Sequence, residues 1–458
     1  MTAPANSESR DVQTGVPDPK RQGLLPLLTR EGKAAPPVRI VHLGLGAFHR
    51  SHQAWFTQHC PDAATWGIAA FTGRRPEAAE TLAAQDGLFT LIVRGPDGDH
   101  FETAESIAEA HSGAKTHRLD ELLAASTTSV VTLTITEAAY QADGPDSPLA
   151  RLVGGLEARR ARAAGPLAVV SCDNVASNGD VAREAVLRIA EARDRTSGEA
   201  ASLTNWIREN VSFVNTSVDR ITPRTTDDDI AEVESRCSYR DRAVVVAEPF
   251  ANWIIAGEFP AGRPAWEAAG AQFVDDIEPF ENRKLWLLNG AHSMLAYAGS
   301  LRGHSTVADA LADARCRDAV EAFWDEAQRH LATPELDIPA YRANLMNRFT
   351  NPRIAHFLEQ ISADGTTKLR MRTVPVLTAE RRAGRSGLAA ASMLAAWIDF
   401  VSAGSSFQDP LREQIQDALA LEGRERTANL LALIDPSLTQ DGDIIYRVDS
   451  LLGSFAAN

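Results

Sequence analysis

The stretch that decides the fold reads Val38-Arg39-Ile40-Val41-His42-Leu43-Gly44-Leu45-Gly46-Ala47. Its first six residues are mostly β-branched or apolar, which predicts a buried strand over 38–43. Gly44 and Gly46 follow at once, and Phe48–Cys60 has a helical pattern. A strand that passes through Gly-x-Gly into a helix is the context of a dinucleotide-binding turn. The first glycine permits the tight turn, and the second lets the backbone approach a pyrophosphate.

The third glycine of the usual pattern is absent, because position 49 is His49. An ordinary strand-turn-helix joint is therefore the alternative. The next strand signal, Trp66–Phe71, runs into Thr72-Gly73-Arg74-Arg75. The end of the second strand should face the adenosine ribose, where a carboxylate favours NAD and an arginine favours the 2′-phosphate of NADP. Arg74 and Arg75 stand there without a carboxylate, so both cofactors stay open, with a solvated loop as the simpler interpretation.

Strand and helix patterns alternate as far as residue 275 and predict an α/β fold with a mostly parallel sheet. Further expected strands are Thr90–Arg94 and Phe101–Ser106 (a hairpin), Ser129–Thr136, Leu167–Cys172, Val211–Val218 and Ala243–Pro249, and the expected helices are Leu149–Ala163 and Asp180–Arg195. Beyond Asn282 the patterns are helical, at Arg283–Ser300, Thr306–Gln328, Pro339–Phe349, Gly387–Ser402, Asp409–Leu421 and Thr427–Leu433. We expect three parts: a flexible tail at 1–35, a Rossmann-type domain at 36–275 and an all-helical domain at 276–458.

The composition restricts the functional classes. The chain of 458 residues has a net charge of −15, so its bulk surface should repel nucleic acid and anionic membranes. Its four cysteines form no Cys-x-x-Cys pair, which argues against a disulfide scaffold and fits a reducing cytoplasm. No signal peptide is visible before the first strand. Ser386–Gly404 is the best candidate for a membrane segment, but it contains Asp399 and predicts a buried helix instead.

The histidines His42, His49, His52 and His59 suggest a zinc hypothesis. His49 with His52, and His52 with His59, have spacings that share a helix face. No third ligand of the cysteine or aspartate type stands at a convincing spacing. Phosphate contacts, capping and solvated faces are simpler explanations, and we expect no metal.

The segment Lys284-Leu-Trp-Leu-Leu-Asn289-Gly290-Ala-His292 carries the most chemistry. On an α-helix Asn289 lies about 140° and His292 about 80° round from Lys284, so all three share one broad face. A buried lysine can act as a base near neutral pH, an amide can donate to an oxyanion, and a histidine can hold a substrate hydroxyl. On physical grounds alone, a surface lysine, a capping asparagine and a core histidine are the simpler interpretation.

These motifs resemble those of the long-chain mannitol dehydrogenase family, which is polyol-specific and independent of zinc. The resemblance rests on Val41-His-Leu-Gly-Leu-Gly-Ala-Phe-His-Arg-Ser-His52, Ser171-Cys-Asp-Asn174 with Asn178-Gly179, Val218-Asp219-Arg-Ile-Thr-Pro223, Lys284-x4-Asn289-Gly-x-His292 and Asp364-Gly-x-x-Lys368. The ordered set is highly specific and covers residues 38–375. The tail, the region after the second strand and the C-terminal end match poorly.

The resemblance implies catalytic roles for three residues. Lys284 would be the general base, and Asn174 and Asn289 would form an oxyanion hole around the carbonyl oxygen of the ketose. Asn174 follows the strand at 167–172, and catalytic groups gather at this end of such sheets. Asn178 competes for the place of Asn174, with a turn before the next helix as its structural alternative.

Substrate contacts are implied as well. His292 and Asp219 would bind substrate hydroxyls or tune the lysine, although Asp219 could instead form an Asx-turn before Pro223. Lys368 would reach the substrate from the helical domain, so the substrate contacts are Asn174, Lys284, His292 and Lys368.

The expected contacts to the dinucleotide are Gly44, Leu45, Gly46, Ala47, Phe48, Arg74 and Glu137, with NAD favoured and NADP open. The family implies oxidation of a polyol at C2 to a ketose, with D-mannitol and D-fructose as the favoured pair. Reduction of fructuronate or tagaturonate is the nearest alternative, for which Arg353, Lys368 or Arg370 could bind the carboxylate. A dinucleotide-binding sensor without activity is an alternative of another class. We expect a cytoplasmic monomer or small homo-oligomer.

Overall fold

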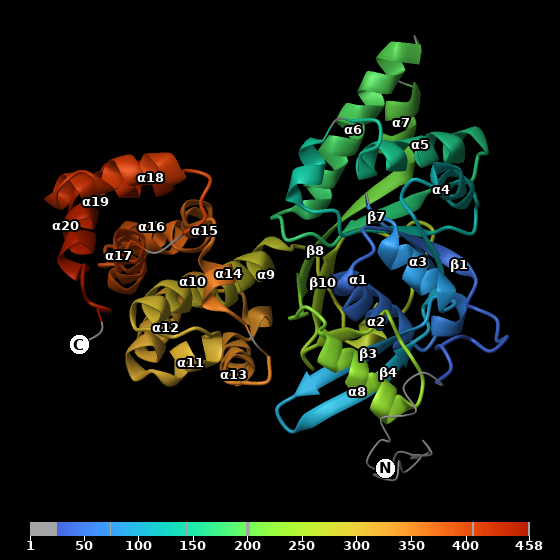
Figure 1. Cartoon of the computed structure of the whole chain (residues 1–458). Helices are drawn as coiled ribbons and strands as arrows, with labels where there is room; N and C mark the ends of the chain where they lie inside the picture. Colours follow the sequence, from blue (N-terminus) through green and yellow to red (C-terminus); the bar gives the residue numbers. More distant parts are fainter. Residues whose placement is uncertain are drawn as a thin grey trace.

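A computed structural model of the chain describes residues 25–73, 75–142, 144–197, 202–354, 356–404 and 407–456. The N-terminal half is built on an eight-stranded sheet, and the C-terminal half consists of helices packed beside it (Figure 1). Among the helices of these residues, none has the length and apolarity that a membrane crossing requires.

The large sheet has the strand order β11-β10-β8-β7-β6-β1-β2-β5. Its strands are β1 (Val38–Leu43), β2 (Gly67–Phe71), β5 (Ile107–His111), β6 (Val130–Leu133), β7 (Leu167–Ser171), β8 (Val211–Asp219), β10 (Asn252–Ala256) and β11 (Gln272–Phe273). The six strands from β5 to β8 are all parallel, with β1 in the middle. This is the Rossmann order, in which the direction of strand succession reverses between β1 and β6. The prediction of a mostly parallel sheet is confirmed, although β10 runs antiparallel to β8.

The sheet is buried on both faces, which explains why its strands read as almost continuous apolar runs. Along β1, Ile40 belongs to one core cluster and Val41 to the other. The cluster of Val41 includes side chains from α4 (Thr116–Leu123), α5 (Pro148–Ala161), α6 (Asn178–Ser197) and α7 (Ser202–Asn210), and that of Ile40 includes α2 (Gln53–Gln58) and α3 (Glu77–Ala84).

The predicted hairpin is confirmed but belongs to a second sheet. Strands β3 (Phe89–Gly95) and β4 (Gly98–Ala104) pair antiparallel, and β3 also pairs in parallel with β9 (Val245–Ala247). Helix α8 (Asp227–Cys237) packs on this small sheet through Val233. The hairpin and α8 project from the lower edge of the N-terminal half in Figure 1.

The helix expected at 48–60 is interrupted. It forms α1 (Ala47–Ser51) and α2, which are separated at His52, where φ is −117° and ψ is −85°. The His52 ring places Nε2 2.9 Å from the carbonyl oxygen of Asn252, so a contact to β10 accompanies the break. The sequence pattern of residues 48–60 alone could not predict this break, because the contact involves a residue 200 positions away.

The expected flexible tail differs from the structure over residues 25–35, while residues 1–24 lie outside the described part of the chain. Leu28 is buried, and its N–H donates to the carbonyl of Arg240 at 2.9 Å. The Arg30 guanidinium donates to the carbonyls of Glu105 at 2.6 Å and Ile107 at 3.0 Å. These bonds fasten the segment to the start of β5, and polar composition alone gave no sign of them.

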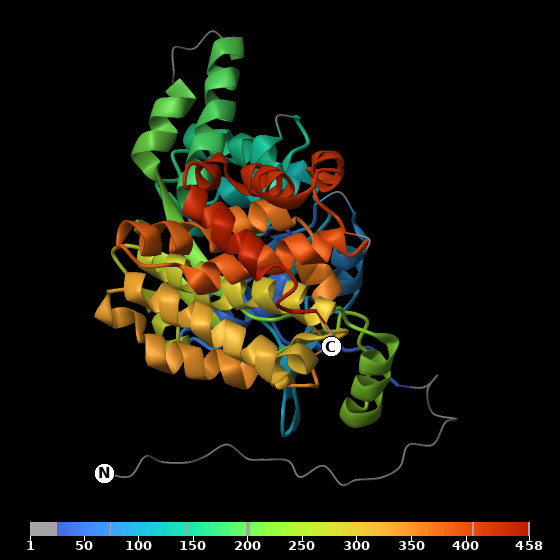
Figure 2. The same ribbon diagram turned by 90° about the vertical axis from the view of Figure 1, so that its left-hand side faces the viewer.

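The C-terminal half contains α9 (Glu278–Arg283), α10 (Gly290–Met294), α11 (Val307–Ala312), α12 (Ala314–Ala327), α13 (Ile338–Phe349), α14 (Leu358–Ser362), α15 (Gly365–Arg372), α16 (Val374–Arg382), α17 (Leu388–Ser402), α18 (Arg412–Leu419), α19 (Gly423–Ile434) and α20 (Gly442–Leu451). Helix α17 lies in their shared core, as expected of a buried helix, with Trp397 almost fully enclosed. Figure 2 shows these helices stacked in front of the sheet domain.

The helix that begins the C-terminal half does not have uniform α-helical geometry. Two π-helical segments, η5 (Lys284–Asn289) and η6 (Leu295–Gly299), alternate with α9 and α10. Hydrogen bonds in a π-helix run from i to i+5, so Asn289 lies about one turn after Lys284. The α-helical angles assumed for this segment are therefore wrong, and the two side chains align more closely than they would on an α-helix.

Candidate functional site

A cavity of about 610 Å³ lies between the two halves of the chain. One wall is formed where β1, β6, β7 and β8 end, and the other by η5, α10, α14 and α15. Among the predicted site residues, the cavity is lined by Gly44, Gly46, Ala47, Phe48, Asn174, Asp219, Lys284, Asn289, His292 and Lys368. Ligands of open α/β sheets bind at the carboxyl ends of the strands, where the strand order reverses, and this cavity has that position.

Two predicted cofactor contacts are not among the residues that line the cavity. Leu45 is buried in the core cluster beneath the turn. Glu137 is exposed at the start of the 3-10 helix η3 (Glu137–Gln141) and is not part of the cavity wall. Arg74 lies outside the described residues.

The two glycines of the turn differ in how much room the protein leaves for a side chain. Gly44 has φ +110°, and a Cβ there would lie 2.0 Å from the carbonyl oxygen of Thr134, so the fold itself demands glycine. Gly46 has an extended backbone with φ −141°, and a Cβ would meet nothing closer than the Gly44 carbonyl at 3.7 Å. The protein therefore tolerates a side chain at Gly46. Since Gly46 lines the cavity, close approach of a ligand is the remaining reason for a glycine.

Lys284 and Asn174 meet across the two halves. The ammonium nitrogen of Lys284 donates to Oδ1 of Asn174 at 2.7 Å. Because a lysine side chain has no acceptor when it is protonated, this bond orients the Asn174 amide with its oxygen toward the lysine and its NH₂ group away from it. Both residues line the cavity, so the NH₂ group of Asn174 is available to a ligand.

The surroundings of Lys284 lower its pKa. Burial is the main cause, the positive charges of Arg372 and Arg348 add to it, and the negative charge of Asp219 opposes it. Asp219 is held by Arg348, whose two terminal nitrogens lie 2.7 and 2.9 Å from its carboxylate oxygens. The same guanidinium binds Glu248 at 2.7 and 2.9 Å. Asp219 therefore forms no isolated Asx-turn but is part of a buried carboxylate–arginine–carboxylate group.

Asn289 and His292 present unpaired polar atoms. Within the described residues, Oδ1 of Asn289 and Nε2 of His292 are buried and have no hydrogen-bond partner. Burial and the neighbouring His356 hold the pKa of His292 well below its usual value, so the ring is neutral. The ring of His356 stands edge-on to that of His292, with 4.7 Å between centroids. A neutral imidazole in this position can accept from or donate to a hydroxyl, depending on its tautomer.

Asn178 has a structural role. Its Nδ2 donates to the carbonyls of Asp173 at 2.9 Å and Thr216 at 2.7 Å, and its Oδ1 accepts from the N–H of Thr216 at 2.9 Å. The side chain is fully buried and bridges the loop after β7 to β8. With both amide hydrogens used in this way, Asn178 has no donor for a ligand, and the geometry favours Asn174 between the two candidates.

Two cations line the far wall of the cavity. Lys368 donates to the carbonyl of Ile361 at 3.0 Å, and Arg372 donates to the carbonyl of Asn289 at 3.2 Å and to Ser293 Oγ at 3.0 Å. Burial and the neighbouring Arg372 lower the pKa of Lys368 to about 8. Among the described residues, neither side chain forms an ion pair with a carboxylate within 4.0 Å.

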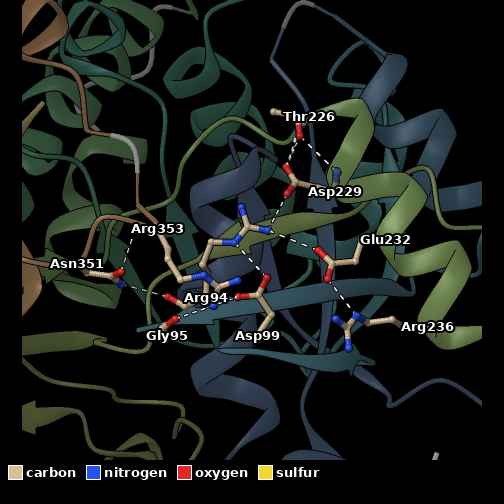
Figure 3. A network of polar contacts seen from close by, with 9 residues as sticks. All are labelled: Arg94, Gly95, Asp99, Thr226, Asp229, Glu232, Arg236, Asn351 and Arg353. Carbon is tan, nitrogen blue, oxygen red and sulfur yellow. Dashed lines mark hydrogen bonds and ion pairs between the residues drawn. The ribbon is translucent and has the colours of Figure 1, made fainter. Parts of the chain in front are cut away.

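The other two arginines proposed as anion ligands lie outside the cavity lining. Arg353 donates to the carbonyl of Gly95 at 2.8 Å and lies 2.9 Å from the carboxylate of Asp99 (Figure 3). It thereby docks the loop after α13 on the β3–β4 hairpin. Arg370 donates to the carbonyl of Ile434 at 2.6 Å, at the end of α19. The structure therefore places neither Arg353 nor Arg370 in the wall of this cavity, in contrast to Lys368.

The histidine cluster packs under the cofactor turn. The rings of His42 and His49 are stacked 3.3 Å apart, and burial lowers the pKa of both. Thr134 Oγ1 donates to the Gly44 carbonyl, so His42 Nε2, at 3.1 Å, must be the donor to Thr134. No group of three potential metal ligands occurs within the described residues. The stacked rings instead support the turn from below.

Sequence reasoning missed Arg348, Arg372 and His356. Arg348 lies 129 positions from Asp219 in the chain, and neither has a local motif that announces the pair. Arg372 stands one helical turn after Lys368, so its position on the same face of α15 could have indicated it.

The family models for the mannitol dehydrogenase Rossmann domain and the mannitol dehydrogenase C-terminal domain match residues 38–268 and 276–453. The chain is 35% identical over 450 residues to a D-mannonate oxidoreductase of Escherichia coli, covering 90% of this chain and 91% of the relative. It is 35% identical over 401 residues to a D-arabinitol 4-dehydrogenase of Ralstonia nicotianae, covering 82% and 85%.

Its structure resembles the ternary complex of Pseudomonas fluorescens mannitol 2-dehydrogenase with NAD and D-mannitol. The TM-score is 0.77, the sequence identity is 30%, and the match covers 95% of this chain and 96% of that one. The resemblance seen in the motifs is confirmed: this chain belongs to the mannitol dehydrogenase family and carries both of its domains.

Proposed function

We propose that this chain oxidises a polyol at C2 to a ketose with NAD as the hydride acceptor, and that D-mannitol and D-fructose are its substrate pair. The observation that carries the proposal is the place of Lys284, which lies in the cavity against Asn174 with a lowered pKa. Membership of the mannitol dehydrogenase family supports it. We also propose a division of the chain near residue 275, with the active site between the two domains.

The turn around Gly44 and Gly46 fits a dinucleotide. Gly46 leaves room where a Cβ would stand, beside the carboxyl ends of β1 and β6. NAD is the cofactor in the solved mannitol 2-dehydrogenase complex, which favours NAD here. When bound, the nicotinamide supplies the acceptor for the hydride that leaves C2.

The residues of the chain would manage the proton and the developing charge. Neutral Lys284 takes the proton of the C2 hydroxyl as the C–H bond breaks and the carbonyl forms. The NH₂ groups of Asn174 and Asn289 donate to the substrate oxygen and stabilise its alkoxide character in either direction. Their placement on opposite domains means that the oxyanion site is complete only when both domains are docked.

Asp219 and His292 would have different tasks. Each carboxylate oxygen of Asp219 already accepts a bond from Arg348, so we assign it to the electrostatic tuning of Lys284. His292 has a buried nitrogen without a partner in the described residues, and we assign it to a substrate hydroxyl. Lys368 would contact the distal end of the substrate.

A second candidate is the reduction of a keturonate. Lys368 and Arg372 line the cavity as two cations that have carbonyl or hydroxyl partners but no carboxylate partner in the described residues. Buried charges are ordinarily paired, so a substrate carboxylate would complete this wall. The D-mannonate oxidoreductase among the relatives is consistent with a sugar acid.

The test is a spectrophotometric assay of the reduced nicotinamide that crosses NAD and NADP with mannitol, arabinitol, sorbitol, fructose, fructuronate and tagaturonate. The proposal predicts the highest kcat/KM with NAD and mannitol, and in reverse with fructose. A preference for a keturonate establishes the second candidate. Absence of activity on all of them, with NADH still bound, supports a non-catalytic sensor and contradicts both enzymatic proposals.

A further inference from the structure

Thr136 has a backbone conformation that L-amino acids other than glycine rarely adopt. Its φ is +74° and its ψ is +152°, in a region that is essentially confined to glycine. The residue is β-branched, which makes this conformation still less favourable. Thr136 follows β6 and lines the cavity. Such a conformation persists only where neighbouring groups hold it, and it tends to occur at functional sites.

The group that holds this turn is the carboxylate of Asp173, from the loop after β7. Its Oδ1 accepts from the N–H of Thr136 at 2.9 Å, and its Oδ2 accepts from the N–H of Ile135 at 3.1 Å. Oδ2 also accepts from the hydroxyl of Tyr140 at 2.7 Å. Because that bond uses the only hydroxyl hydrogen of Tyr140, Ser171 must donate to the phenol oxygen, at 2.6 Å.

Asp173 also stands next to the catalytic asparagine. Its own carbonyl accepts from Val175 N–H and from Asn178 Nδ2, both at 2.9 Å. The following residue, Asn174, receives the bond from Lys284. On the other side of the turn, Thr134 Oγ1 donates to the Gly44 carbonyl at 2.8 Å. One continuous series of contacts thus joins the cofactor turn, the loop after β6, the loop after β7 and Lys284.

We propose that Asp173 is a positioning residue, which holds the strained turn at Ile135–Thr136 and through it aligns Asn174 with the cofactor turn. The proposal rests on the proposed function for the role of Asn174. Asp173 itself lines the cavity, but its two carboxylate oxygens already accept three bonds from the protein. We therefore assign it to shaping the site and not to binding the substrate.

The test is a double-mutant cycle between Asp173 and Thr136. Asp173→Ala removes all three acceptor bonds, so the turn relaxes and kcat/KM falls by about tenfold or more. In Asp173→Asn the amide oxygen replaces one carboxylate oxygen as an acceptor. The kcat/KM of this variant should therefore lie between those of the wild type and Asp173→Ala. Glycine adopts the strained conformation at little cost. The factor by which Asp173→Ala lowers kcat/KM should therefore be at least about threefold smaller in the Thr136→Gly variant than in the wild type.

The matched control is Ala163→Gly, which places a glycine at another position with positive φ, +51°, in the turn that precedes β7. The factor by which Asp173→Ala lowers kcat/KM should be the same with and without Ala163→Gly. If Thr136→Gly fails to reduce the cost of Asp173→Ala, or if Ala163→Gly reduces it as much, the positioning role is wrong.

Hydrogen exchange gives a readout that does not depend on the reaction. In Asp173→Ala the amides of residues 134–140 should exchange faster, while those of 150–160 in α5 should exchange as in the wild type. Unchanged exchange at 134–140 contradicts the proposal even if activity falls. If exchange becomes faster but the wild-type protein oxidises no polyol and reduces no keturonate, Asp173 still holds the turn at Ile135–Thr136, and the proposed function is refuted.

Discussion

A lysine acts as a base near neutral pH only where its surroundings disfavour the ammonium form. Lys284 meets this condition through burial and through the nearby Arg372 and Arg348, while Asp219 limits the effect. The spacing Lys284-x4-Asn289 was recognisable in the sequence. Of the charges that tune the lysine, Asp219 was expected from the family resemblance, whereas Arg348 and Arg372 were not. Arg348 reaches the site from a helix that lies 129 positions from Asp219 in the chain, and no local pattern contains that contact.

The lowered pKa of Lys284 predicts opposite pH dependences for the two directions. Oxidation needs the neutral amine, so its kcat/KM should fall as the pH drops below the lysine pKa. Reduction needs the ammonium form as the acid, so its kcat/KM should fall as the pH rises above the same value. Steady-state pH profiles of mannitol oxidation and fructose reduction test this. If kcat/KM fell toward the same end of the pH range for both oxidation and reduction, Lys284 could not be the shared acid and base.

Lys368 provides a separate test of the substrate class. Its pKa is about 8, so its positive charge is lost as the pH rises past that value. If it binds a carboxylate, the KM for fructuronate should increase above about pH 8, and Lys368→Met should abolish this increase. The KM for fructose serves as the control. A KM for fructuronate that does not change across this range would exclude Lys368 as the carboxylate ligand.

The cofactor turn shows how much of one element a sequence can predict. The strand, the Gly-x-Gly pair and the following helix all occur where the sequence places them. The break at His52 and the π-helical segment η5 do not follow from the sequence, because each depends on packing partners from distant segments. Helix type and strand identity come from local periodicity, whereas these deviations come from tertiary contacts.

Alanine substitutions at the two glycines of this turn should have different effects. Gly44→Ala should destabilise the protein, because its φ is positive and a Cβ would clash with the Thr134 carbonyl. Gly46→Ala should leave the thermal midpoint near that of the wild type but raise the Kd for NADH by about tenfold or more, since the methyl group would occupy the space for the cofactor. Thermal unfolding and NADH fluorescence titration measure the two effects. An unchanged Kd for Gly46→Ala would contradict the placement of the cofactor.

At the scale of the whole molecule, the sequence predicted the sheet-then-helix order but not how the two halves dock. Arg348 from α13 binds Asp219 and Glu248, and Arg353 binds Asp99 on the hairpin, as Figure 3 shows for the latter. These ion pairs join residues that are at least a hundred positions apart in the chain. A single sequence contains no signal for such pairs, so the way in which the two halves dock could not be predicted from it.

Arg348→Met should destabilise the protein by roughly 3–5 kcal/mol, because it leaves two buried carboxylates unpaired. Arg348 lowers the pKa of Asp219, so the stabilisation is present above the unfolded pKa of about 3.9 and is lost as the pH falls through the folded value. The difference in thermal midpoint between wild type and variant should therefore stay nearly constant from pH 7 to about pH 5 and shrink as the pH falls below about 4. The control, Arg236→Met, removes an exposed pair with Glu232 that contributes little. Equal effects of the two substitutions would contradict the role of Arg348.

The most direct test of the account is Lys284→Ala, measured for turnover and for cofactor affinity in the same preparation. Loss of a general base should lower kcat by about 10²–10⁴-fold, while the Kd for NADH stays within about twofold of the wild type. The thermal midpoint of Lys284→Ala, compared with that of the wild type, checks that the variant is correctly folded. Turnover of Lys284→Ala close to that of the wild type would contradict the central claim.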